Sequence, residues 1–275
     1  MTGSAAKLGA DDVRVLRPDA LSGLSAVVSG AGSGIGRAVA LRLIELGARV
    51  TGVGRRETLL EETRALATEP DRFEARPCNV RDIEAMSAVV RETGDAHGIG
   101  LLFNNAGGQF FAPADDISPN GWNSVIDLNL TAVFHATRVA HPYLAATRGS
   151  VVNISLSGVD RGGMGMAHSI AARAGVLGMT RSLALEWAEE GIRLNCLGPG
   201  TVVTGGLSEE ASEHVLGNLV GKATPMHRDT SVEEVAELVC FLASPAGALM
   251  TGQLIQLDGG AHIGPGLHML PEAYR

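Results

Sequence analysis

The sequence lacks long hydrophobic runs, paired cysteines and clustered basic residues, and each absence excludes a class of protein. No apolar run approaches the ~20 residues that a membrane-spanning helix needs, so a membrane protein is not expected. Lys and Arg are scattered along a chain of formal net charge −8, which argues against a nucleic-acid-binding surface and restricts any phosphate binding to a local site. The three cysteines (Cys78, Cys196 and Cys240) and the histidines show no metal-ligand spacing, so no bound metal is expected.

The odd number of thiols and the lack of a recognisable signal peptide predict a cytoplasmic protein. With 275 residues, of which 45% are hydrophobic, the chain is long enough for one large α/β domain with a single core. We expect that domain to cover residues 23–262. Residues 1–22 are polar and rich in Gly and Ala, which predicts a flexible leader, and residues 263–275 are expected to form a C-terminal tail.

From Leu24 onward, short runs rich in β-branched residues alternate with longer amphipathic segments, as is typical of βαβ units. This alternation predicts a single-domain α/β fold of Rossmann type, a doubly wound parallel sheet of about seven strands with helices on both faces and ligands at its carboxyl edge. The expected strands, some with the loop that follows, lie at 24–30, 48–53, 72–80, 100–107, 150–157, 192–200 and 253–260, and the expected helices at 35–46, 57–68, 81–93, 121–145, 165–190 and 231–243.

The first chemical motif is "SGAGSGIG", residues 29–36, between the first expected strand and its helix. Gly30 allows a tight turn, Gly34 lets the backbone approach a pyrophosphate, and Gly36 permits close packing of helix on strand. The amides at the helix start, with Ser33 and Ile35 among them, would face the phosphates. The motif in this context predicts dinucleotide binding.

With these residues the chain resembles the short-chain dehydrogenase/reductase family from about Leu24 to Gly260. The family's glycine motif appears as "SGAGSGIG", its NNAG motif as "NNAG" at 104–107, and its helix asparagine as Asn129 in "DLNL". Its PG motif appears within "GPG" at 198–200, and the closing "TGQLIQLDGG" is similar to the family's carboxyl end. The resemblance implies an NAD(P)-dependent oxidoreductase whose further cofactor contacts would be Asn79, Val80, Asn105, Ala106, Gly107, Pro199, Gly200 and Val202.

Cofactor preference depends on the end of the second strand, "GVGRRE". A carboxylate there would bind a ribose 2′-hydroxyl and repel a 2′-phosphate, but Gly54 stands in its place and Arg55 and Arg56 follow. Because guanidinium groups pair well with phosphate, NADP(H) is favoured. NAD(H) stays as the alternative, since both arginines could be ordinary solvated residues at a helix start.

The family's catalytic serine, tyrosine and lysine are all replaced when "AARAG" is matched to the family's lysine segment. Leu156 then takes the place of the serine, Ser169 that of the tyrosine and Arg173 that of the lysine. Ser169 is too weak an acid to replace a phenol by itself, and Arg173 stays protonated, although it can still hold the nicotinamide ribose. Ser157 could replace the missing serine only if the chain shifts locally after the strand, because neighbours on a strand point to opposite faces.

A reduction that tolerates these losses is hydride addition to a 2-enoyl thioester, which places charge on the thioester oxygen and needs hydrogen-bond donors there. "NNAGGQFFAPADDIS" (104–118) and "AHSIAARAGV" (167–176) resemble the family's trans-2-enoyl-CoA and 2,4-dienoyl-CoA reductase branch. The expected partner is therefore a small-molecule substrate, with an acyl-CoA as the first candidate. The candidate donors are Ser169, His168, Ser157, Gln109 and Asn129, and for Asn129 a supporting role at a helix bend is as well founded as direct catalysis.

Two other functions stay open: a carbonyl reductase or secondary-alcohol dehydrogenase with an atypical proton donor, and a dinucleotide-binding protein without redox activity. The irregular segment of about 200–230 resembles the family's lid, in which Thr201 and Thr204 could contact the nicotinamide amide. The helices at 121–145 and 165–190 carry small and apolar residues on more than one face, and the related family pairs such helices across two-fold axes. We therefore expect a homotetramer or a homodimer.

Overall fold

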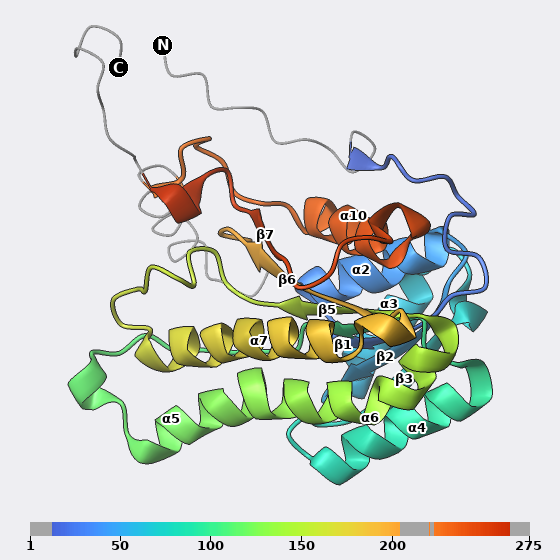
Figure 1. The fold of residues 1–275 in the computed structure, drawn as a ribbon, viewed down its shortest axis with the longest axis horizontal. Helices are drawn as coiled ribbons and strands as arrows, with labels where there is room; N and C mark the ends of the chain where they lie inside the picture. Colours follow the sequence, from blue (N-terminus) through green and yellow to red (C-terminus); the bar gives the residue numbers. More distant parts are fainter. Residues whose placement is uncertain (1–12, 204–219, 221–222, 265–275) are drawn as a thin grey trace, which may run out of the picture.

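The fold is a parallel β-sheet between two layers of helices (Figure 1). The computed structural model describes residues 13–203, 220 and 223–264. The order of the strands in the sheet is β3-β2-β1-β4-β5-β6-β7, and every neighbouring pair is parallel. The order reverses between β1 and β4, where doubly wound sheets bind ligands, and the predicted fold class is confirmed. The strands are β1 (Ser25–Ser29), β2 (Arg49–Gly54), β3 (Phe73–Pro77), β4 (Leu101–Asn104), β5 (Ser150–Ile154), β6 (Arg193–Pro199) and β7 (Leu254–Leu257).

The helices divide between the two faces of the sheet. In Figure 1, α2 and α10 lie above it, and α4, α5, α6 and α7 lie below. The helix expected at 121–145 is in fact two helices joined by a π-helical turn at Asp127–Thr131, a feature that often marks a functional site. The helices are α2 (Gly34–Glu45), α3 (Glu57–Leu66), α4 (Ile83–His97), α5 (Pro119–Ile126), α6 (Ala132–Thr147), α7 (Ala167–Glu186) and α10 (Val232–Ala243).

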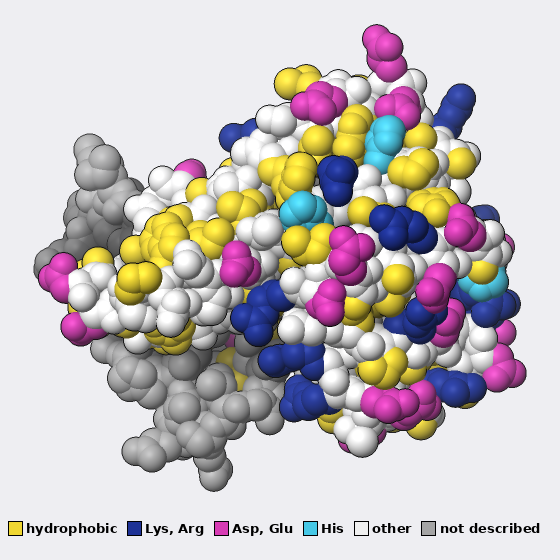
Figure 2. Space-filling view, turned by 90° about the horizontal axis from the view of Figure 1, so that it is seen from below, with side chains coloured by type: hydrophobic (Ala, Val, Ile, Leu, Met, Phe, Trp, Pro, Cys, Tyr) yellow, Lys and Arg dark blue, Asp and Glu magenta, His cyan; other side chains and the backbone are white. Residues whose placement is uncertain are grey.

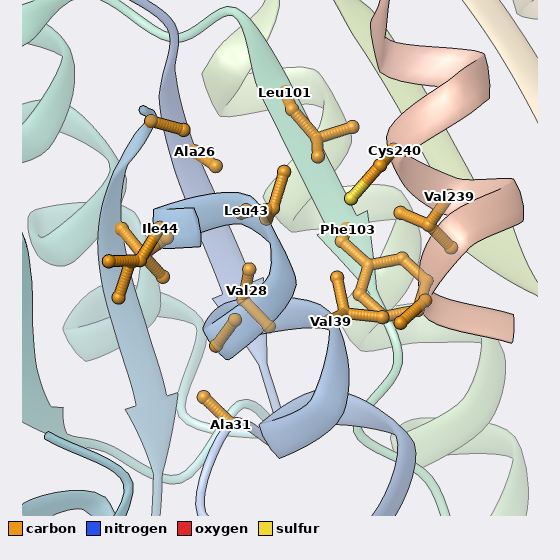
Figure 3. Packing of buried hydrophobic residues seen from close by; sticks show 14 of the residues in the cluster. Ala26, Val28, Ala31, Val39, Leu43, Ile44, Leu101, Phe103, Val239 and Cys240 are labelled. Atoms are coloured by element: carbon orange, nitrogen blue, oxygen red, sulfur yellow. The ribbon is translucent and has the colours of Figure 1, made fainter. Parts of the chain in front are cut away.

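The core fills both faces of the sheet, which is why its central strands β1, β4 and β5 are buried along their whole length and largely apolar. All five residues of β1 are buried, with Val28 facing α2 and α10 and Val27 facing the opposite helices. Figure 3 shows Val28 and Phe103 beside Leu43 of α2 and Val239 of α10. Because Leu43 is fully buried, truncating it to Ala would cost about 2–5 kcal/mol.

Residues 13–22, which the sequence assigned to a leader, contact the domain in the structure. The Glu237 carboxylate accepts hydrogen bonds from the backbone amides of Val15 and Leu16, each at 2.8 Å, and pairs with Arg42 at 2.7 Å. Leu21 is only 3% exposed and belongs to the core. The sequence did not indicate this packing because the few apolar residues are separated by polar and charged ones.

The surface that faces away from α2 and α10 carries acidic and basic side chains side by side, and hydrophobic ones gather at the end where α5 and α7 begin (Figures 1 and 2). Within the described part of the chain, no helix is both long and apolar enough to cross a membrane. Most of the expected lid, including Thr204, lies outside the described residues, as does the tail from residue 265.

Candidate functional site

A cavity of about 790 Å³ opens beside the switch point of the sheet. Its wall combines the glycine-rich turn after β1, the start of α3, the loops after β3 and β4, one face of α5 and Arg173 of α7. The residues predicted from the sequence that line it are Gly30, Ser33, Gly34, Ile35, Arg55, Arg56, Asn79, Val80, Asn105, Ala106, Gly107, Gln109, Arg173 and Val202. The cavity therefore lies where a doubly wound fold binds a dinucleotide.

The glycine-rich turn has the geometry that the motif predicted. Gly30 and Gly34 have φ values of 72° and 51°, which residues other than glycine rarely adopt. A Cβ on Gly36 would lie 2.1 Å from the carbonyl oxygen of Gly30, so only glycine allows this approach of helix and strand. Gly36 does not line the cavity itself, and its role is to let α2 pack closely against the turn after β1. The Ser29 hydroxyl accepts hydrogen bonds from the amides of Asn105 and Ala106, at 2.9 and 3.0 Å, and so joins this turn to the loop after β4.

The start of α2 is suited to an anion. Its N-cap residue, Ser33, makes no side-chain hydrogen bond to the helix, so no cap occupies the first-turn amides beside the cavity. Arg37 fixes the turn from outside, since its Nη2 donates to the carbonyl oxygen of Gly32 at 2.6 Å and its Nε to the Thr63 hydroxyl at 3.0 Å. The unfilled amides fit a pyrophosphate.

The end of the cavity next to β2 carries positive charge. Arg55 and Arg56 are exposed, and their side chains form no ion pair or hydrogen bond with any other described residue. Asn79 accepts a hydrogen bond from the backbone amide of Arg81 at 3.2 Å, which holds the turn after β3. Cys78 also lines this end, and burial raises the pKa of its thiol, so it is a packing residue rather than a reactive one.

Arg173 is a buried cation in the wall of the cavity. It is 8% exposed, its Nη1 donates to the carbonyl oxygen of Ile154 at 2.5 Å, and its Nη2 donates to Oδ1 of Asn129 at 3.2 Å. No carboxylate of the described residues pairs with it. Burial lowers its pKa to about 10, so Arg173 is charged at neutral pH and available to a polar or anionic ligand.

Asn129 holds the loop after β4 in place. Its Nδ2 donates to the carbonyl oxygen of Gly108 at 2.8 Å, and its Oδ1 accepts from the amide of Gly108 at 3.1 Å as well as from Arg173. The residue is 1% exposed and sits in the π-helical turn. These contacts favour the supporting role that the sequence left open.

Gln109 and Phe110 cover the first turn of α7. The Ser169 hydroxyl donates to Oε1 of Gln109 at 2.6 Å, and the rings of Phe110 and His168 meet edge to face at 4.3 Å. His168 is fully buried, and among the described residues neither of its ring nitrogens has a hydrogen-bond partner. Gln109 and Phe110 line the cavity, whereas Ser169 and His168 lie behind them.

The serines after β5 bond to other segments and do not line the cavity. The Ser157 hydroxyl donates to the carboxylate of Asp258, and Ser155 bonds the carbonyl oxygen of Arg173 at 3.4 Å. Ser157, Pro199 and Gly200 do not line the cavity, although the sequence placed them in the site. The direction of the Ser157 hydroxyl depends on Asp258, about a hundred residues later in the chain, which a local motif does not reveal.

Several residues of the wall were not predicted from the sequence. Ser124 and Val125 of α5 and Leu128 of the π-helical turn lie on one helical face, and their spacing is also that of an ordinary core face, so it indicated no site. Phe110 stands beside the predicted Gln109. The other unpredicted wall residues are Gly32, Gly54, Leu59, Cys78, Arg81 and Gly108. Among the described residues no cluster could hold a metal ion.

Comparisons with known proteins agree with this geometry. The family model described as enoyl-(acyl carrier protein) reductase matches residues 30–262. A probable 2,4-dienoyl-CoA reductase of Bacillus subtilis is 35% identical over 246 residues, covering 87% of this chain and 96% of that protein. A 3-oxoacyl-(acyl-carrier-protein) reductase of Thermotoga maritima is also 35% identical over 246 residues, covering 87% of this chain and 98% of that protein. The crystal structure of a putative short-chain alcohol dehydrogenase from Sinorhizobium meliloti superposes with a TM-score of 0.83 at 32% identity, covering 90% of this chain and all of that one.

Proposed function

The chain belongs to the short-chain dehydrogenase/reductase family and is an NAD(P)-dependent oxidoreductase, and we propose that it transfers hydride from NADPH to the C=C bond of a 2-enoyl thioester. The observation that carries this proposal is the contact between Ser169 and Gln109, in a wall whose one buried cation among the described residues is Arg173. Hydrogen-bond donors gather there, and none of them, among the residues that the structure describes, is a phenol. The similarity to a probable 2,4-dienoyl-CoA reductase supports the same reaction.

NADP(H) is proposed over NAD(H) because the two exposed arginines after β2 have no partner among the described residues. A 2′-phosphate would pair with Arg55 or Arg56, the pyrophosphate would meet the amides at the start of α2, and Arg173 would hold the nicotinamide ribose. When bound, the reduced nicotinamide supplies the hydride. The protein's own residues supply orientation and charge stabilisation.

Gln109 is the proposed donor to the thioester oxygen. Its Oε1 accepts a hydrogen bond from the Ser169 hydroxyl, so the two N–H groups of its amide are left for other acceptors. Negative charge that develops on the thioester oxygen during hydride addition would be stabilised by this amide and by the nearby Arg173 cation. The α-carbon then takes a proton from water, and no residue need act as a strong acid.

We assign Ser169 and Arg173, at the family's tyrosine and lysine places, roles that need neither a proton donor nor a base. Ser169 orients Gln109 rather than donating a proton to the substrate. Arg173 is charged at neutral pH, because its pKa is about 10, so it acts as a fixed cation and not as a base. His168 is not required, since it is buried behind Phe110.

Carbonyl reduction is the second candidate, because a 3-oxoacyl-(acyl-carrier-protein) reductase is as similar in sequence as the dienoyl-CoA reductase. That reaction needs a proton donor for the alkoxide oxygen. Among the described residues, Ser169 at the start of α7 is the serine that could donate this proton, but its hydroxyl already donates to the side-chain amide of Gln109. This arrangement favours the enoyl reaction.

The deciding experiment follows NADPH oxidation with crotonyl-CoA, with acetoacetyl-CoA and with a panel of simple ketones. We expect turnover of the enoyl thioester, and deuterium from heavy water at the α-carbon of the product. Gln109→Glu should lower kcat about 10²- to 10³-fold, since it removes an oxyanion donor at nearly constant shape. Efficient reduction of ketones without any reduction of enoyl thioesters would make carbonyl reduction the correct assignment.

A variant with the family's usual residues provides the matched comparison. Leu156→Ser, Ser169→Tyr and Arg173→Lys together should give some ketone reduction, while enoyl reduction falls because a phenol fills space that the thioester uses. An unchanged ratio of the two activities would contradict the proposed roles of these positions.

A further inference from the structure

Asp258, directly after β7, is a buried carboxylate at the centre of a hydrogen-bonded cluster. It is 4% exposed, and its oxygens accept hydrogen bonds from the Ser157 hydroxyl, from the amide of Gly260 at 3.0 Å and from the amide of His262 at 2.7 Å. The His262 ring adds a contact at 3.0 Å. Burial would raise the pKa of Asp258, but the bonds from Ser157 and His262 bring it below its ordinary value, so the carboxylate is charged at neutral pH. A buried charge with this many donors is a strong local anchor.

The turn that Asp258 organises joins the loops after β5, β6 and β7. A Cβ on Gly200, after β6, would lie 2.9 Å from Cα of Asp258, so these two segments are in close contact. The hydroxyl of Thr230 donates to the carbonyl oxygen of Leu257 at 2.9 Å. The amide of Met226 donates to the carbonyl oxygen of Gly259 at 3.2 Å. The segment that leads into α10 is therefore fixed to the same turn.

The Ser157 bond connects this turn to the cavity wall. Arg173 donates to the carbonyl oxygen of Ile154, and Ser155 bonds back to the carbonyl oxygen of Arg173. Ser157 lies two residues further along the same strand end and points to Asp258. The segment 154–157 is thus held on one side by the residue that faces the cavity and on the other by Asp258.

We propose that Asp258 is a positioning residue, which acts through Ser157 to hold segment 154–157 and so places the Arg173 guanidinium in the cofactor site. The strand end is also tied to β6, because Ile154 pairs with Leu197 and the amide of Ser155 donates to the carbonyl oxygen of Leu197 at 2.7 Å. The Ser157 bond adds a restraint on the side toward β7, and its loss would loosen the carbonyl of Ile154 that orients Arg173. The inference goes beyond the proposed function, because it holds for whichever substrate the enzyme reduces.

The test measures NADPH binding and amide hydrogen exchange in the variants Ser157→Ala and Asp258→Asn. Neither measurement requires a substrate. Binding of NADPH, followed by its fluorescence, should weaken about two- to thirtyfold, the range found when a residue acts on a site through a neighbour. Exchange over residues 155–166 should rise about tenfold or more, as expected when one charge-assisted hydrogen bond is lost. Ser157→Thr keeps the hydroxyl and should restore both properties.

Asp160→Asn is the matched control, since Asp160 is an exposed carboxylate in the same loop, and this variant should leave binding and exchange unchanged. If Asp258→Asn does not fold, Ser157→Ala decides alone, because it removes only a hydroxyl. The proposal is overturned if exchange over 155–166 stays as in the wild type, or if exchange rises while NADPH binding is unaffected. A failure to reduce enoyl thioesters would overturn the proposed function and leave this result standing.

Discussion

Replacing Arg173 by methionine separates what the buried charge costs from what it does for the cofactor. The side chain is 8% exposed, and the fall of its pKa from its ordinary value to about 10 corresponds to about 3 kcal/mol of lost hydration of the charged form. Methionine is neutral, unbranched and adaptable, so Arg173→Met removes this cost without leaving a large void.

The same substitution removes two hydrogen bonds, to the carbonyl oxygen of Ile154 and to Oδ1 of Asn129. A hydrogen bond made by a charged group contributes about 1.5–3 kcal/mol, so the two losses are of the same order as the gain. We therefore expect the free energy of unfolding of the cofactor-free protein to change by less than about 2 kcal/mol, measured by urea unfolding. A loss above about 4 kcal/mol would refute the balance between desolvation and hydrogen bonding argued for Arg173.

The pH dependence checks the sign of the charge effect. Because the pKa of Arg173 is lower in the folded than in the unfolded protein, the desolvation cost is fully present below about pH 10 and is relieved as the pH rises above it. Relative to Arg173→Met, the wild-type protein should therefore gain stability between about pH 9 and pH 11. A constant difference over that interval would contradict a depressed pKa.

Cofactor binding should respond in the opposite way to stability. NADP⁺ that binds only the folded state raises the unfolding midpoint, and each tenfold loss of affinity removes about 1.4 kcal/mol of that stabilisation. In Arg173→Met we expect this protection to fall by at least one such step, because the ribose loses its anchor. Equal protection of both proteins by NADP⁺ would show that Arg173 does not touch the cofactor.

Three further predictions concern the cofactor, the Ser169 contact and self-association. Arg55→Asp should shift the ratio of dissociation constants from NADP toward NAD, because it removes a phosphate partner and adds an acceptor for a 2′-hydroxyl; an unchanged ratio would refute the assignment. Ser169→Ala should lower enoyl reduction about ten- to a hundredfold but not abolish it. When Ser169→Ala is combined with Gln109→Ala, the double variant should be almost as active as Gln109→Ala alone, since the two residues act as one unit. Phe134 on α6 is 39% exposed and Leu185 on α7 is 82% exposed, so we expect these helices to pair in a dimer or tetramer, and a monomer in sedimentation at micromolar concentration would contradict this.

Most of the fold could be predicted from the sequence because a parallel sheet is covered on both faces. Its strands are then short, continuous apolar runs, and the strand expected at 24–30 is observed at Ser25–Ser29. The glycine-rich turn could also be predicted, since its conformations are nearly exclusive to glycine. The packing of Leu21 could not, because it depends on contacts with distant segments, and the helix bend at Asn129 was indicated only by the family resemblance and not by the local pattern.

The site divides in the same way. Residues that act through their backbone, such as Gly30 and Ala106, could be placed by motif, whereas side chains whose direction is set by distant partners could not. Ser157 is an example, because its hydroxyl donates a hydrogen bond to Asp258, about a hundred residues away along the chain. His168 of α7 is another, since its ring packs against Phe110 of the loop after β4.

In the proposed reaction, the contact between Ser169 and Gln109 determines how the first turn of α7 contributes to chemistry. The two residues are sixty positions apart, and each alone has a different meaning: a serine at that place suggests a weak acid, and a glutamine in an exposed loop suggests a solvated side chain. Together they form a donor whose direction is fixed, because the hydroxyl occupies the amide oxygen and leaves the N–H groups. A fixed donor is worth more than a mobile one when charge develops on a substrate oxygen, since it needs no reorganisation during the reaction. If Ser169 stands at the family's tyrosine place, as we propose, a serine there is consistent with a change in the bond that is reduced rather than with the loss of reductase activity.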